Sequence, residues 1–74
     1  MPEEIVFLKA LSVFDPETAT VQLRRETQSG TLSLFMLTEK RSHRMGSFNP
    51  AMANHWQKIS EDLGWAVSVV DWTY

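Results

Sequence analysis

The alternation of apolar and polar residues divides the chain into segments joined by short turns. In residues 19–26, Ala19, Val21 and Leu23 alternate with polar residues, which is the period-two pattern of a strand with one buried face. Residues 31–38 begin with the same alternation and end apolar on both faces, and residues 65–74 are rich in valine and aromatic side chains. Each of these three segments is predicted to form a strand.

The first apolar segment is open to two interpretations. Residues 5–14 are rich in Val, Ile and Phe, and Asp15 and Pro16 after them are typical of a type I turn, so we interpret the segment as a strand that pairs with residues 19–26. Pro2 and the two acids after it are also a good helix start, because proline suits the first helical position and acids suit the positive end of the helix dipole.

A helix is predicted to begin at Asn49. Asparagine is a favoured N-cap, Pro50 suits the first helical position, and Gly64 suits the left-handed residue that ends a helix. Between them, apolar residues recur at helical spacing and form one stripe that can pack on a sheet. The stripe consists of Met52, Trp56, Ile59 and Leu63. Residues 39–48, which are polar and basic, are predicted to form the one long loop.

These elements predict one α+β domain over residues 1–74, with a four-stranded, largely antiparallel sheet and one helix packed on one face, in the order β-β-β-α-β. A helix about 10 Å across cannot cover both faces of a sheet roughly 19 Å wide. One face is therefore expected to stay open. Because the first and last predicted strands have apolar residues on both sides, we expect the open face to be apolar.

An apolar open face on a small domain indicates an interface. A chain of 74 residues has a small core, so burial against a partner is also expected to stabilise it. We therefore expect a small non-catalytic interaction module of the accessory or inhibitor type, which binds another protein or forms a homodimer with a second copy. The expected interface anchors are Phe7, Leu11, Trp72 and Tyr74. A curled sheet, a bulge near Lys9 or a helical first segment would remove the apolar open face.

The charge distribution supports an alternative function. Seven basic and nine acidic residues give a net charge of −2, too near zero to indicate a nucleic-acid or membrane partner by itself. The basic residues are concentrated in residues 21–48, however, where they can meet phosphates while aromatic side chains of the sheet stack on bases. The candidate anion contacts are Arg24, Arg25, Lys40, Arg41, His43 and Arg44. The alternative is therefore binding of single-stranded nucleic acid by the sheet and the basic loop over residues 39–48.

The chain offers few residues for catalysis. It has no cysteine, His43 and His55 lack a second ligand at metal spacing, and its three glycines form no phosphate-binding loop. We therefore expect no enzymatic activity, no metal and no cofactor.

Features of the sequence also bear on localisation. The acidic start is unlike a secretory signal, and the uncharged residues 27–38 are too few and too polar to span a membrane. With no cysteine to form disulfides, the expected setting is the cytoplasm, with no membrane partner.

Overall fold

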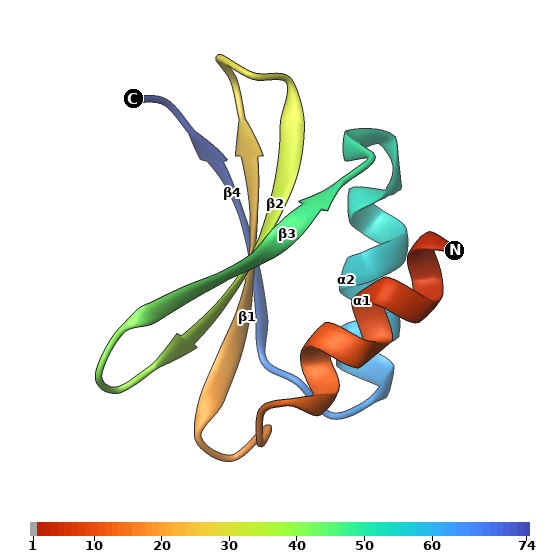
Figure 1. Cartoon of the computed structure of the whole chain (residues 1–74), viewed down its shortest axis with the longest axis vertical. Coiled ribbons are helices and arrows are strands. Elements are labelled where there is room, and N and C mark those ends of the chain that lie inside the picture. Colours follow the sequence, from red (N-terminus) through yellow and green to blue (C-terminus); the bar gives the residue numbers. More distant parts are fainter. Residues whose placement is uncertain (1) are drawn as a thin grey trace.

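The computed structural model describes residues 2–74, and over this range the chain forms two α-helices, one short 3₁₀ helix and four strands (Figure 1). In chain order the elements are α1 (Glu3–Ser12), β1 (Ala19–Glu26), β2 (Thr31–Thr38), β3 (Ser42–Phe48), η1 (Pro50–Met52), α2 (Ala53–Asp62) and β4 (Val67–Trp72). The α+β class is confirmed. Within the described residues, neither helix has the length and apolar character needed to cross a membrane.

The four strands form one sheet in the order β3-β2-β1-β4. The first three strands are an antiparallel meander, while β4 returns through α2 to lie parallel to β1. The sheet is therefore mainly antiparallel, with one parallel pair. Figure 1 shows α1 and α2 on the same side of this sheet, so one face is covered by both helices and the other by neither.

The segment interpreted as a first strand is a helix instead. Its acidic first turn suits the helix dipole, and Phe7, Ala10 and Leu11 recur at the spacing of one helical face and are buried. The period is obscured because apolar residues also occupy the outer face of α1. These residues are Ile5, Val6 and Leu8, with exposed fractions of 43%, 41% and 37%. The prediction of a single helix was therefore wrong, and the helical alternative was correct.

Most of the basic segment expected to be a loop, residues 42–48, forms strand β3. Its pairing with β2 contains a bulge: Leu34 lies opposite Gly46 and Phe35 lies opposite Arg44, which leaves Met45 as an extra residue. A bulge interrupts the alternation of buried and exposed positions, and this hides the strand from a period-two pattern. Four strands were expected and four are present, but only because this missed strand replaces the one wrongly assigned to α1.

Three aromatic rings join the helices to the sheet. Phe7 of α1 stacks on Trp56 of α2, with 4.6 Å between ring centroids, and meets Phe48 of β3 edge-on at 5.3 Å. All three side chains are buried, together with Leu23 and Leu34 of the sheet. The contacts of Phe7 attach the inner face of α1 to the hydrophobic core, and burial of this aromatic ring is expected to contribute strongly to stability.

Helix α2 begins close to where its sequence signals place it. The Asn49 side chain accepts a hydrogen bond from the backbone N–H of Ala51 at 3.0 Å and caps η1, which leads into α2. Trp56 is buried as the predicted stripe requires, but Leu63 is 55% exposed. Ser60 is buried in the last turns of α2, where its hydroxyl donates to the Trp56 carbonyl at 2.8 Å.

Gly64 ends α2 in a Schellman motif. The N–H of Trp65 donates to the Ser60 carbonyl and that of Gly64 to the Glu61 carbonyl, each at 3.0 Å, and Gly64 has a φ of +96°. An added Cβ would meet no atom within 4 Å, so the cost of a side chain here is only that of the backbone conformation. We expect Gly64→Ala to lower the free energy of unfolding by about 1–2 kcal/mol in urea denaturation. Gly64→Asn should lose less, and an alanine variant as stable as the original chain would rule out this role.

Candidate functional site

The uncovered face of the sheet, which we call the open face, has mixed aromatic, aliphatic and polar side chains. The strand registers place the alternate residues of β1 and their cross-strand partners on it. Its residues include Thr20, Gln22, Arg24, Glu26, Ser33, Phe35, Leu37, Arg44, Ser47, Ser68, Val70 and Trp72. The expectation of an apolar open face is therefore wrong. The apolar positions of β1, such as Val21 and Leu23, all face the helices.

The centre of this face is a cation–π arrangement across three neighbouring strands. The guanidinium carbon of Arg24 on β1 lies 3.7 Å from the ring centroid of Phe35 on β2 and 4.1 Å from that of Trp72 on β4. The Arg24 Nε donates to the Gln22 side-chain oxygen at 2.7 Å. The cation is thus held on both faces by rings and on one edge by an amide. We call Phe35, Arg24 and Trp72 the arginine stack.

A buried carboxylate lies beside the arginine stack. Glu26 is 8% exposed and accepts hydrogen bonds from the hydroxyls of Ser33 and Tyr74. These bonds, the Ser33 bond foremost, and the positive charges of Arg44 and Arg24 hold the pKa of Glu26 below its ordinary value. The same hydrogen bond to Glu26 raises the pKa of the Tyr74 hydroxyl. At neutral pH this part of the face therefore holds an ionised carboxylate and a neutral phenol.

The lowered pKa of Glu26 predicts a contribution to stability that depends on pH. The contribution is fully present above the ordinary pKa of about 4.5 and is lost as the pH falls through the lower folded-state pKa. We therefore expect the urea midpoint of the native chain to exceed that of Glu26→Gln at neutral pH, and the gap to shrink as the pH is lowered below about 4.5. Glu17→Gln, at an exposed position, is the matched control and should show no such gap. A gap that does not change with pH would contradict the assignment.

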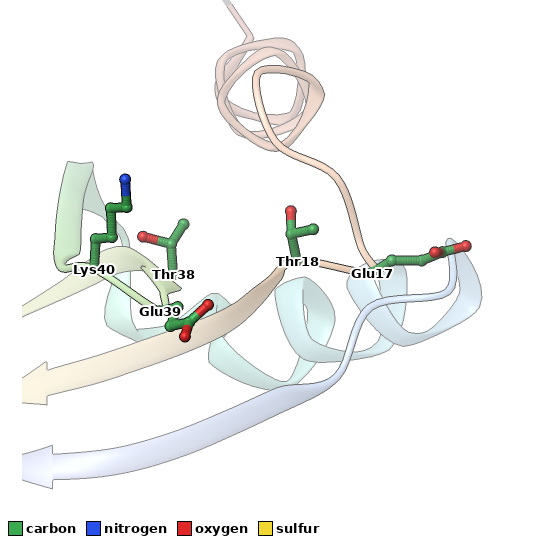
Figure 2. Close-up of a pocket in the computed structure, with 5 residues that line it drawn as sticks. All are labelled: Glu17, Thr18, Thr38, Glu39 and Lys40. Atoms are coloured by element: carbon green, nitrogen blue, oxygen red, sulfur yellow. The ribbon is translucent and has the colours of Figure 1, made fainter.

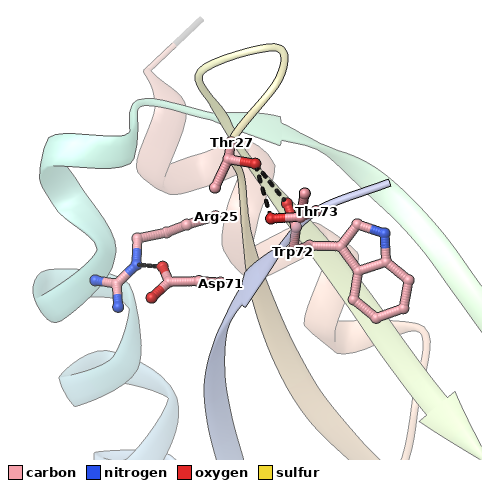
Figure 3. Close-up of polar contacts among 5 residues, drawn as sticks. All are labelled: Arg25, Thr27, Asp71, Trp72 and Thr73. Atoms are coloured by element: carbon pink, nitrogen blue, oxygen red, sulfur yellow. Dashed lines mark hydrogen bonds and ion pairs between the residues drawn. The ribbon is translucent and has the colours of Figure 1, made fainter.

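The end of β4 is fixed by polar contacts that orient Trp72. The Thr27 N–H donates to the Trp72 carbonyl at 3.0 Å, and the Thr27 hydroxyl contacts this carbonyl and the Thr73 hydroxyl at 3.2 and 3.1 Å (Figure 3). Arg25 pairs with Asp71 at 2.8 Å, also across β1 and β4. In Figure 3 this ion pair points toward the helices, whereas the indole of Trp72 points the opposite way.

The four predicted interface anchors do not come together. Trp72 is half-buried in the arginine stack, and Tyr74 is 72% exposed next to Glu26, with the two rings 6.4 Å apart. Phe7 and Leu11 are 0% and 3% exposed in the core beneath α1. Their assignment as anchors is therefore wrong, because it required the first segment to be a strand with two accessible faces.

The basic residues predicted to contact anions are also divided between surfaces. Arg24 and Arg44 lie on the open face, with Arg44 donating to Ser47 at 2.6 Å. Arg25 is on the helix side in its pair with Asp71, and the His43 ring contacts Phe14, 5.2 Å between centroids. Lys40 and Arg41 are in the turn between β2 and β3. The six residues thus form no single basic patch.

A shallow hollow lies at one end of β1 and β2. It is lined by Glu17, Thr18, Thr38, Glu39 and Lys40 (Figure 2). In Figure 2 the two carboxylates and the ammonium group point in different directions. Within residues 2–74, no three or more His, Asp or Glu side chains are grouped in a way that could hold a metal ion.

Three residues of the site were missed in the sequence: Phe35, Gln22 and Glu26. Alternation is the signal that points to them, because Gln22, Arg24 and Glu26 must face away from the buried Val21 and Leu23. Comparison with known proteins provides no further assignment, since no protein-family model, curated protein or solved structure matches the chain. A function for this chain must therefore be inferred from the geometry of the open face.

Proposed function

We propose that this chain is a non-catalytic protein-interaction module that binds a protein partner through the open face, centred on the arginine stack. The observation that carries the proposal is that both helices pack on the other face, which leaves tryptophan, tyrosine, phenylalanine and arginine side chains together on an uncovered sheet. Tryptophan, tyrosine and arginine are the residues most enriched among those that dominate binding energy at protein interfaces.

The fixed geometry of these side chains also supports a binding role. Arg24 is held by two rings and by Gln22. The backbone of Trp72 is held by a hydrogen bond from the Thr27 N–H to the Trp72 carbonyl. Immobilising a flexible side chain when a partner binds costs about 0.5–1.5 kcal/mol of free energy. Side chains that are already ordered avoid much of this cost. The open face is thus organised for association before any partner arrives.

Charge favours a different protein over a second copy of the chain. A two-fold dimer through the open face would bring two copies of Arg24 and Arg44 together, while both Glu26 carboxylates already accept internal hydrogen bonds. The face is also limited in size: its flat footprint is roughly 19 Å by 20 Å, or about 400 Å², whereas a standard interface buries about 800 Å² of accessible surface, a quantity larger than the flat footprint of the same side chains, on each partner. We infer a transient complex, or one in which the partner extends beyond the sheet.

Site-specific photo-crosslinking tests this proposal. A photoreactive amino acid is placed at Leu37 or Ser68 on the open face and, as a matched control, at the exposed Lys58 on α2. In lysate of the native host treated with nuclease, the two open-face positions should form protein adducts that the α2 position does not. Equal labelling from both faces, or adducts that disappear on nuclease treatment, would overturn the proposal, and the second result would favour nucleic acid.

A further inference from the structure

The arginine stack leaves the outer edge of one guanidinium unoccupied. Arg24 uses its Nε for Gln22, and its two flat faces are covered by Phe35 and Trp72. Among residues 2–74, its terminal Nη1 and Nη2 atoms form no hydrogen bond or ion pair. The side chain is half-buried, so this edge is the part of the cation that remains for an external group.

The chemistry of this edge matches a planar anion. A guanidinium presents two parallel N–H donors that bind a carboxylate in a bidentate manner, and rings stacked on both faces fix the plane in which the anion must approach. The nearest carboxylate, that of Glu26, is already bound by Ser33 and Tyr74. The charge of Glu26 is thus near Arg24, but within residues 2–74 no carboxylate forms a hydrogen bond or ion pair with the terminal nitrogens of this guanidinium.

The surroundings favour a carboxylate of a protein over the phosphates of a nucleic acid. Apart from Arg24, the only other arginine of this face, Arg44, donates to Ser47 and Ser33 at 2.6 and 3.4 Å. Arg25, Lys40 and Arg41 lie off the open face, so a row of cations that follows a phosphate backbone is missing. Val70, opposite Arg24 on β4, instead provides an apolar neighbour for a peptide side chain.

We propose that Arg24, clamped between Phe35 and Trp72, is a carboxylate receptor that binds an aspartate or glutamate side chain of an acidic, partly apolar segment in the partner protein. This inference rests on the proposed function and specifies the chemistry of the partner. The rings set the orientation of the fork, Gln22 holds its inner edge, and the incoming carboxylate accepts from Nη1 and Nη2.

Selection from a library of displayed random short peptides tests the inference. The native chain should select peptides with an acidic residue at one fixed position, and replacing that acid by its amide should weaken binding at least roughly tenfold. Arg24→Lys keeps the charge but lacks the fork, and it should lose the acidic preference. Arg25→Lys is the matched control, because Arg25 pairs with Asp71 on the other side of the sheet, and it should select the same peptides as the native chain.

A second variant retains the arginine and separates binding from folding. Gln22→Glu places a carboxylate beside the guanidinium, where it should compete with the peptide and weaken binding at least roughly tenfold without loss of the fold. Peptides without an acidic position, no selected peptides, or the same acidic consensus on Arg24→Lys would overturn the inference. Tighter binding of oligothymidylate than of the best peptide would overturn it in favour of phosphate.

The outcomes also separate this inference from the proposed function. Crosslinks from the open face to a protein, together with selected peptides that lack an acid, would retain the interaction module and remove the carboxylate receptor. An absence of open-face crosslinks would remove the interaction module, whatever peptides are selected.

Discussion

Phe7→Ala is expected to lower the free energy of unfolding by about 3–5 kcal/mol, the range for removing a buried aromatic ring. Phe7 is fully buried and contacts the rings of both Trp56 and Phe48, so its loss leaves a cavity where α1, α2 and β3 meet. A domain of this size has a net stability of only roughly 3–5 kcal/mol. We therefore expect the variant to be largely unfolded near room temperature, as measured by urea denaturation and near-ultraviolet circular dichroism.

Leu8→Ala is the matched control on the same helix. Leu8 is next to Phe7 but 37% exposed, so its truncation should cost less than about 1 kcal/mol. If the two variants lost equal stability, α1 would not be packed with its Phe7 side on the core. If Phe7→Ala were as stable as the native chain, the segment would not be part of the core at all.

Trp72→Ala is expected to weaken binding to the crosslinked partner by at least roughly 30-fold, which corresponds to about 2 kcal/mol and is typical of an aromatic residue at the centre of an interface. The substitution removes one ring from the arginine stack and a large contact surface from the open face. Arg24 then loses the constraint on one of its two faces. Binding is measured by titration calorimetry with the partner isolated through the photo-crosslink.

Leu63→Ala is the control for this loss of affinity. Leu63 follows α2 and is 55% exposed, so it is an apolar side chain outside the open face. It should retain native affinity. Because Trp72 is only half-buried, its alanine variant should still fold, and a folded variant with native affinity would place the interface elsewhere.

The sequence predicts those parts of the fold in which local signals agree. The alternation over β1 and the turn at Asp15 and Pro16 are present in the structure. So are the Asn49 cap, which begins η1 ahead of α2, and Gly64, which ends α2. Each depends on residues close together in the chain. Local patterns are sufficient there because hydrogen bonding and burial are decided within one element or one turn.

The two wrong elements have physical causes that lie beyond one-dimensional patterns. Helix α1 has apolar residues on its outer face as well as on its core face, so neither a helical nor a strand period dominates. In β3 the extra residue Met45 changes which side chains face the core partway along the strand. The structure assigns both because it includes the tertiary contacts of Phe7 and Phe48.

The candidate site could be predicted only in part from the sequence, for a related reason. Trp72 was predicted as an anchor and Arg24 as an anion contact, but nothing in their positions indicates that they touch. Their contact requires β4 to lie parallel to β1, which depends on the crossover through α2. The role of Phe35 as the second ring likewise follows from the register of β1 and β2.

Hydroxyl-radical footprinting of the free chain and of its complex with the crosslinked partner shows whether the open face is the binding surface. In the free chain, Trp72 and Tyr74 should react while the buried Phe7 and Trp56 are protected. In the complex, Trp72 and Tyr74 should become protected, while the exposed Leu63 beyond α2 should react as before. Protection of Leu63 with unchanged reactivity of Trp72 and Tyr74 would show that the partner binds outside the open face.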